Sequence, residues 1–192
     1  MTNHQPEQHT AKESINLGLL TLLETKSIDQ ISVKTIVQHA GVSRSTFYLH
    51  YYDKYDLMDQ LEAKITDAFL AHFRQEPDTE NQTVTIYDVT VNICHHVLSY
   101  RAFYQHAFRD PQFMQSLSNL LKDQLIHVYN NRSYATFASY GTIGFLSDWV
   151  TSGFQVSPEE AGESLVTISS TDWSQYISQT IDRATHNHSS SD

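Results

Sequence analysis

Residues 32–61 constrain the fold most, because a single glycine separates two short helical patterns within them. Apolar residues recur at helical spacing over residues 33–40, and Gly41 follows where a helix can end in a left-handed residue. Ser43 can cap a second helix that runs to about Tyr51. The pattern therefore predicts two short helices joined by a tight turn, with a third helix beginning near Lys54.

The second helix of this pair has two chemically different faces. Phe47 and Tyr51 lie one turn apart and are expected to face inward. An α-helix fits the major groove of DNA, where arginine binds guanine, hydroxyls bind bases or phosphates, and leucine contacts a thymine methyl. The outward side chains with this chemistry are Arg44, Ser45, Thr46, Tyr48 and Leu49, flanked by Lys34 and Lys54 as phosphate anchors. An ordinary helical hairpin with a solvated polar face is the alternative.

The run IVQHAGVSRSTFYLHYYDKYDLM resembles the DNA-binding segment of the TetR/AcrR family of bacterial transcription regulators. The matching residues are Ala40, Gly41, Val42, Ser43, Thr46, Tyr48, His50, Tyr51, Lys54 and Leu57. The resemblance implies that Thr46, Tyr48, His50 and Lys54 contact DNA, with Ser43 beside them and Gly41 in the turn. It also implies that Arg44, Ser45 and Leu49 occupy the variable positions that set sequence preference. Tyr52 and Tyr55 are bulkier than the residues often found around this lysine.

Charge is distributed unevenly along the 192 residues, whose formal net charge is -10. Residues 1–56 contain 5 Lys and Arg against 6 Asp and Glu, whereas the remainder contains 7 against 16. The acidic remainder predicts modest affinity for non-specific DNA. No apolar run reaches the ~18 residues of a membrane span, and no signal-peptide pattern is present. We therefore expect a cytoplasmic protein without a membrane partner.

Helical periodicity continues to the C-terminal part of the chain, and no convincing strand pattern occurs, which predicts an all-α, TetR-like fold. The expected organisation is a helix-turn-helix DNA-binding domain over residues 8–56 and an all-helical dimerisation and regulatory domain over residues 57–185. Residues 1–7 and 186–192 are expected to be disordered tails. A tail helix around Trp173 and Ile181 is also predicted.

Gly141 and Gly144 lie three residues apart beside aromatic side chains. Small residues at this spacing let another helix approach closely, either inside one subunit or across a dimer interface. TetR-like proteins pair through their last two helices, so the resemblance implies a homodimer interface that includes Gly141, Gly144, Phe145 and Leu165. Residues 140–165 also resemble a C-terminal domain of firmicute family members, including regulators of dihydroxyacetone kinase operons.

Aromatic side chains with polar tips recur in the C-terminal domain and predict a ligand pocket lined by Tyr87, Tyr104, Phe108 and Trp149. Plain core packing is the alternative. Cys94 and His95 point about 100° apart on a helix, so they do not form a preorganised catalytic pair. No histidine pair in this domain has helical metal-ligand spacing. We therefore expect no enzyme activity, no cofactor and no metal site.

Together these features predict a transcriptional regulator, a repressor that binds a palindromic operator in double-stranded DNA as a homodimer. A small-molecule effector would release or modulate it. The alternative is a protein-interaction co-regulator controlled by a partner protein instead of a small ligand.

Overall fold

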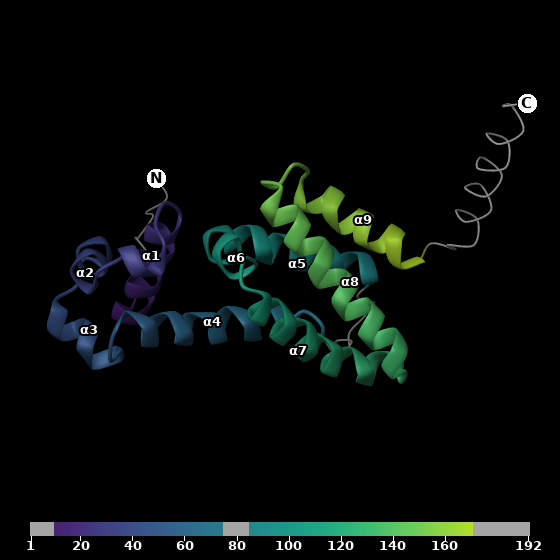
Figure 1. Cartoon of the computed structure of the whole chain (residues 1–192), viewed down its shortest axis with the longest axis horizontal. Helices are drawn as coiled ribbons and strands as arrows, with labels where there is room; N and C mark the ends of the chain where they lie inside the picture. The colour runs from purple at the N-terminus through teal and green to yellow at the C-terminus, as the bar shows by residue number, and fades with distance from the viewer. Residues whose placement is uncertain (1–9, 75–84, 171–192) are drawn as a thin grey trace, which may run out of the picture.

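The computed structural model describes residues 10–74 and 85–170, which form nine α-helices and one short 3-10 helix and contain no strand (Figure 1). The all-α prediction is thereby confirmed. In chain order the helices are α1 (Ala11–Leu23), η1 (Ile28–Gln30), α2 (Val33–Ala40), α3 (Arg44–His50), α4 (Lys54–Ala71), α5 (Ile86–Ser99), α6 (Arg101–Ala107), α7 (Pro111–Tyr129), α8 (Arg132–Thr151) and α9 (Pro158–Ser170).

Helices α1, α2 and α3 pack against one another and form what we call the head. The predicted capping box of Thr10 and Glu13 begins α1, and the side chains of Ile15 and Leu19 from α1 are fully buried. Gly18 lets α2 approach α1, since a Cβ atom there would lie 3.3 Å from the carbonyl oxygen of Ile36. The head thus has a core of its own, on which α3 is mounted.

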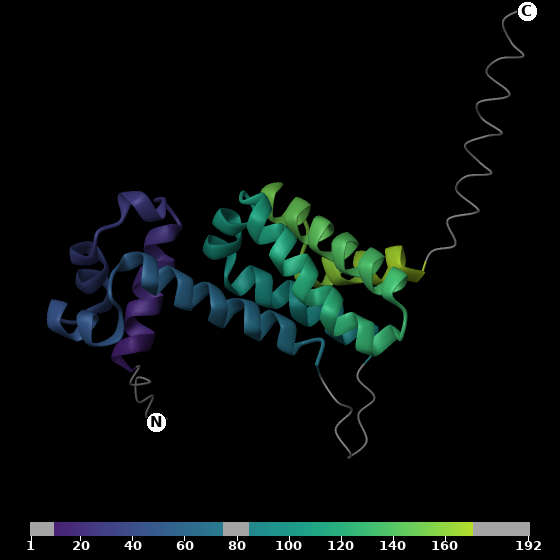
Figure 2. The same cartoon turned by 60° about the horizontal axis from the view of Figure 1, so that its bottom comes forward.

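Helix α4 runs from the head to the remaining helices, as Figures 1 and 2 show. Asp53 caps it by accepting hydrogen bonds from the amides of Tyr55 and Asp56 at 2.8 and 2.9 Å. Its buried side chains recur at helical spacing and include Leu57, Leu61 and Phe69. Helix α4 ends at Ala71.

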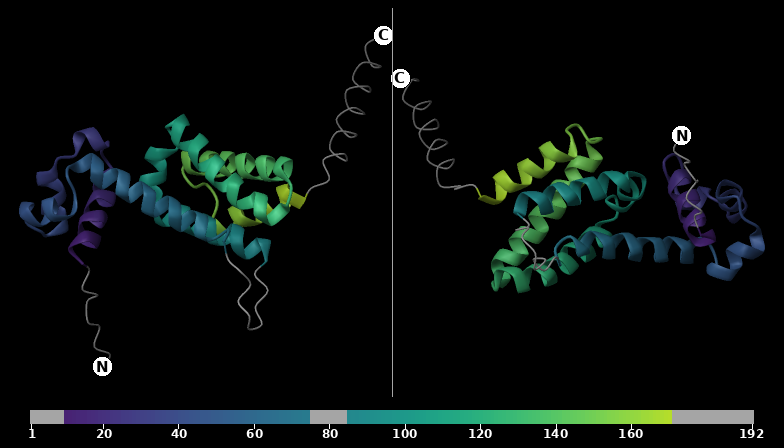
Figure 3. Two further views of the ribbon diagram at one scale, coloured as in Figure 1. Left: turned by 90° about the horizontal axis from the view of Figure 1, so that it is seen from below. Right: turned by 180° about the vertical axis from the view of Figure 1, so that it is seen from behind.

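Helices α5 to α9 form what we call the body (Figure 3). Asn130, in the left-handed region, ends α7, and Asn131 caps α8 by accepting from the amides of Ser133 and Tyr134. Helix α8 therefore begins at Arg132. Helices α7 and α8 form a hairpin, and α9 packs along α5.

Head and body touch through α1 and α6, where Arg101 lies 3.3 Å from Glu24. The predicted boundary at residue 56 falls within the first turn of α4. The predicted tails and the helix around Trp173 lie outside the described residues. Across residues 10–74 and 85–170, no helix is both long enough and apolar enough to cross a membrane.

Candidate nucleic-acid interface

The turn before α3 has the backbone geometry that the sequence predicted. Gly41 adopts a φ of 65°, and the amide of Val42 donates to the carbonyl oxygen of Val37 at 3.1 Å. A residue with a Cβ is strained at this φ, so glycine sets the angle between α2 and α3. The Ser43 hydroxyl then caps α3 by accepting from the amide of Thr46 at 3.0 Å.

The inward face of α3 is locked into the head by two aromatic residues. Phe47 is fully buried and Tyr51 is 2% exposed. The Tyr51 hydroxyl donates to the side-chain oxygen of Asn16 in α1 at 2.8 Å. Burial raises the pKa of Tyr51 to about 12, so this hydroxyl keeps its proton. These contacts fix how α3 is rotated about its own axis and therefore which side chains face outward.

The outward face of α3 is open to solvent at the end of the molecule farthest from the body (Figure 1). Arg44 donates to the Tyr48 hydroxyl at 3.2 Å, so these two side chains lie along one edge of the helix. Leu49 is 81% exposed, and Ser45 and His50 are also exposed. The Leu49 side chain is therefore accessible to a partner.

Three hydroxyls cluster at the start of α3. The Ser43 oxygen lies 2.7 Å from that of Ser45 and 2.8 Å from that of Thr46. Ser45 is exposed and Thr46 is half-buried, so both can also reach an external acceptor such as a phosphate oxygen.

The two lysines predicted as phosphate anchors differ in their surroundings. Lys34 is exposed on α2, and its ammonium group has no partner in the described part of the chain. Lys54 instead donates to the carbonyl oxygens of Ile28, Asp29 and Ile31 at 2.8, 3.0 and 2.9 Å. An ammonium group has three N–H donors, so all of them are already used. This arrangement was not foreseen from the sequence.

Tyr52 is a surface feature that sequence reasoning did not assign to the interface. It follows directly after α3 and is 86% exposed. Its backbone amide donates to Asp56 at 2.7 Å, which holds the loop in place. The sequence does contain a signal, because a tyrosine is unusually bulky at this position. Tyr52 therefore extends the exposed face beyond the end of α3.

The glycines Gly141 and Gly144 lie on the outer face of α8. A Cβ atom at either position would meet no described atom within 4 Å, so close packing inside the subunit does not explain them. Phe137, one turn before Gly141, is 68% exposed, and Ile168 on α9 is 41% exposed. Phe145 is half-buried. Leu165 is 7% exposed and belongs to the core of its own subunit, so it offers a partner little surface.

The close helix contact inside the body occurs at Gly162 instead. A Cβ atom there would lie 2.6 Å from Val91 Cγ2 and 2.9 Å from the Val91 backbone nitrogen. Only a glycine lets α9 pack this closely against α5. The sequence alone does not identify Gly162 as a contact residue, because its partner Val91 is distant in the chain.

The four residues predicted to line a ligand pocket have different surroundings. Tyr104 is fully buried and packs on Phe108, with ring centroids 5.2 Å apart. The Trp149 indole donates to the carbonyl oxygen of Val156 at 3.0 Å, whereas Tyr87 is 45% exposed. Tyr104, Phe108 and Trp149 are thus buried in the core of the body, and Tyr87 lies at its surface.

The surroundings of Cys94 and His95 are those of structural residues and not of a catalytic pair. Cys94 is fully buried, and desolvation raises the pKa of its thiol to about 12, which removes the thiolate needed for nucleophilic attack. His95 pairs with Glu159 at 2.9 Å. Within the described ranges, no group of three histidine, cysteine or acidic side chains is placed to hold a metal ion.

Both parts of the chain match known families. Residues 19–61 match bacterial regulatory proteins of the tetR family, and residues 84–171 match a transcriptional regulator C-terminal region. These matches cover the end of α1, all of α2 and α3, the start of α4 and the whole described body.

Two similar proteins are also named HTH-type transcriptional regulators. The chain is 24% identical over 166 residues to the uncharacterized HTH-type transcriptional regulator YxbF of Bacillus subtilis, covering 78% of this chain and 42% of that protein. It is 27% identical over 71 residues to an HTH-type transcriptional regulator of Staphylococcus aureus, covering 37% of this chain and 38% of that protein. The chain thus spans less than half the length of these curated relatives.

Solved structures share the fold. The dihydroxyacetone kinase operon activator DhaS superposes with a TM-score of 0.66 at 16% identity, covering 83% of this chain and 93% of that one. SmeT, the repressor of a Stenotrophomonas maltophilia multidrug efflux pump, superposes with a TM-score of 0.65 at 13% identity, covering 84% and 89%. These likenesses show a shared fold. The two family matches, over residues 19–61 and 84–171, show that the chain belongs to the TetR family of transcriptional regulators.

Proposed function

We propose that this regulator represses transcription by binding a palindromic operator as a homodimer, with α3 in the major groove. The observation that carries the proposal is the outward face of α3, where Arg44, Tyr48 and Leu49 are exposed while Phe47 and Tyr51 hold the helix from behind. A helix fixed in this way presents one defined set of side chains to the groove.

The proposed roles follow from side-chain chemistry. Arg44 reads guanine and Leu49 contacts a thymine methyl. Ser43, Ser45, Thr46, Tyr48, His50 and Lys34 contact phosphates or base edges, and Tyr52 adds a contact beside α3. The Arg44 guanidinium already lies along α3 through its hydrogen bond to Tyr48, which reduces the rotamer freedom that it must lose on binding. Lys54 is proposed to support the head from inside and not to contact phosphate.

We further propose that a second copy of the chain covers the exposed apolar face of α8. The residues of this face recur at helical spacing along α8 and are Phe137, Gly141, Gly144 and Phe145. On α9, the exposed Ile168 is proposed to contact the second copy instead of the buried Leu165. Apolar side chains flanking glycines allow two helices to pack closely. Two-fold pairing here places two copies of α3 on one duplex, which explains why the proposed operator is a palindrome.

How the regulator is released stays open between a small-molecule effector and a partner protein. Tyr104 and Trp149 are buried and packed, and the Trp149 indole is hydrogen-bonded to Val156. Core packing accounts for these aromatic residues without a ligand, so a partner protein is the second candidate.

The test is a mobility-shift assay with purified protein and DNA from upstream of its own gene, followed by footprinting. We expect a protected palindrome whose half-sites lie about one helical turn apart. A variant with Arg44 and Leu49 both changed to alanine should lose the footprint, whereas the control Arg132→Ala, exposed on α8, should keep it. Equal binding of this fragment and random DNA of the same length would contradict the proposal. Adding cell extract, whole or filtered to remove proteins, separates a partner protein from a small effector.

A further inference from the structure

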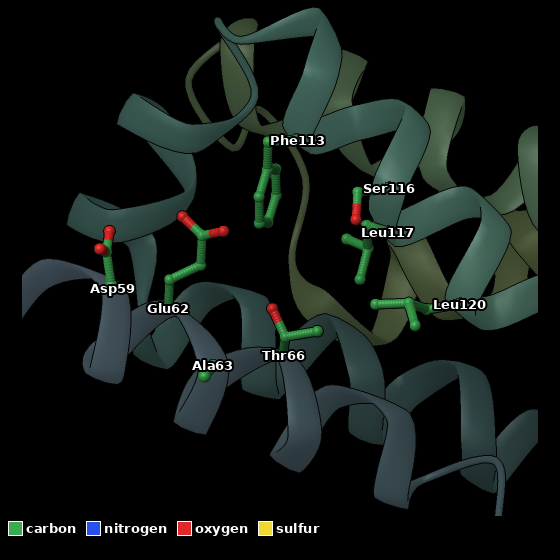
Figure 4. Close-up of a pocket in the computed structure, with 8 residues that line it drawn as sticks. All are labelled: Asp59, Glu62, Ala63, Thr66, Phe113, Ser116, Leu117 and Leu120. Carbon is green, nitrogen blue, oxygen red and sulfur yellow. The ribbon is translucent and has the colours of Figure 1, made fainter.

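A cleft of about 270 Å³ lies between α4 and α7, away from α3. One of its lining residues, Phe113, packs against Phe103 and Phe108 in the body. Figure 4 shows side chains from both helices directed into it. The lining residues are Asp59, Glu62, Ala63 and Thr66 of α4 and Phe113, Ser116, Leu117 and Leu120 of α7. None of these residues was assigned a function from the sequence.

The two walls of the cleft differ in chemistry. The α7 wall is mostly apolar, with Phe113 and Leu117 buried behind Leu120, which is 42% exposed. The α4 wall is polar, and in Figure 4 the carboxyl group of Glu62 and the hydroxyl of Thr66 point into the space facing α7. A ligand that fills the cleft therefore needs an apolar part on one side and a polar part on the other.

The polar wall is negatively charged and lacks a cation of its own. Asp59 and Glu62 are both acidic, and none of the eight lining residues is basic. Within the described residues, Glu62 forms no salt bridge and no hydrogen bond. Burial, together with the nearby charges of Asp59 and Asp110, raises the pKa of Glu62. The charged form of its carboxyl group is therefore less stable here than in water. A bound cation would offset that cost, whereas an anion would increase it.

We propose that the cleft between α4 and α7 binds an organic cation, an amine or quaternary ammonium group joined to a small apolar or aromatic body. The cation lies against Glu62 and Asp59, and the apolar body lies against Phe113, Leu117 and Leu120. A cationic headgroup can also lie over the Phe113 ring. The cleft is near the lower end of small-molecule sites in size, which favours a small ligand.

The position of the cleft connects it to the head. Helix α4 begins directly after α3 and provides one wall, while the body provides the other. A ligand between these walls favours one spacing of α4 and α7 and therefore one placement of the head relative to the body. It changes DNA affinity only if it binds one placement more tightly. This consequence rests on the proposed function, whereas the binding site itself does not.

The test uses calorimetric titration of the full chain with benzyltrimethylammonium as the probe and phenylacetate as the probe of opposite charge. We expect the cation to bind and the anion not to bind. Glu62→Gln keeps the side-chain size, removes the charge and should weaken binding about tenfold or more. The matched control is Glu163→Gln, an exposed carboxylate on α9, which should bind as the wild type does. Ala63→Leu, which fills the cleft without changing its charge, should also abolish binding.

The proposal is overturned if the cation does not bind, if both probes bind equally, or if Glu62→Gln and Glu163→Gln behave alike. Thermal melting of each variant shows whether it is folded, and if Ala63→Leu is not, the pair of glutamate variants decides. Operator binding is measured separately without the probe, so a failed cleft leaves the DNA-binding result intact. Conversely, if the chain binds the cation but no operator, the proposed cleft site stands and the proposed DNA-binding function is wrong.

Discussion

The ammonium nitrogen of Lys54 lies 2.8 Å from the carbonyl oxygen of Ile28, although 26 residues separate them in the sequence. The same nitrogen reaches the carbonyl oxygens of Asp29 and Ile31. Lys54 is the first residue of α4, and the three carbonyls belong to the segment between α1 and α2. One side chain thus joins the two backbone segments that flank the α2–α3 pair, and it should hold the recognition helix at a fixed angle.

The first prediction is that Lys54→Met weakens the head without removing a phosphate contact. Losing hydrogen bonds from a charged donor should cost about 2 kcal/mol of stability, seen as a lower melting temperature. Operator affinity should fall at every salt concentration, while the slope of log affinity against log salt stays unchanged. In the matched variant Lys34→Met, melting should be unchanged and the slope should fall by about 2 per dimer. A reduced slope for Lys54→Met with normal melting would show that Lys54 contacts phosphate.

Local features were predictable from the sequence because the partners lie a few residues apart. Thr10 and Glu13 form the expected capping box, Ser43 and Asp53 cap α3 and α4, and Gly41 takes the left-handed conformation. Each of these depends on backbone geometry within one turn. The helix-turn-helix was therefore readable before any tertiary contact was known.

Contacts between distant residues were not predictable in the same way. A lysine beside α3 suits a phosphate or a set of backbone carbonyls equally well, and the sequence gives no sign of the three carbonyl oxygens to which Lys54 donates. The sequence alone does not distinguish the packing of Gly141 from that of Gly162. Of these two, only Gly162 is packed against another helix of the described subunit. Aromatic periodicity likewise does not distinguish a pocket from a core, and Tyr104 belongs to the core.

The second prediction concerns base reading by Arg44. Replacing it with alanine should relax the preference at one symmetric operator position and cost about 1 to 3 kcal/mol per half-site, because a bidentate contact to guanine is lost. Tyr48→Phe removes the hydroxyl that accepts from Arg44 and that is itself proposed to contact DNA, so it should weaken affinity while keeping the base preference set by Arg44. Selection of binding sites from random DNA measures both. An identical consensus for wild type and Arg44→Ala would exclude Arg44 from base reading.

The third prediction contrasts two kinds of glycine. The double variant Gly141→Leu, Gly144→Leu should separate the proposed dimer, since overpacking a close contact costs about 1 to 3 kcal/mol. A Cβ atom at either position meets no described atom within 4 Å, and both glycines lie on the exposed face of α8, so sedimentation should show folded monomers, and operator binding should be lost. Gly162→Ala should instead lower the stability of each subunit, because its Cβ would lie 2.6 Å from Val91 Cγ2. A double variant that sediments as a stable dimer would place the interface on another surface.

The last prediction is a loss of stability at mildly acidic pH that originates at His96. Its ring shares a 3.1 Å hydrogen bond with the Tyr104 hydroxyl and lies 5.6 Å from the ring of His72. Burial, with a smaller contribution from His72, lowers the pKa of His96 to about 4, so the folded state keeps it neutral. In the unfolded chain the His96 ring takes up a proton below its ordinary pKa of ~6.5. The contribution of His96 to stability is therefore complete above that pH and falls as the pH drops toward 4.

Because His96 is partly solvated, we expect a loss of about 1 kcal/mol between about pH 7 and about pH 5. Urea unfolding at both pH values should show a smaller loss for His96→Gln, which does not titrate, whereas His127→Gln, at an exposed position on α7, should match the wild type. Equal losses in all three proteins would place the acid sensitivity elsewhere.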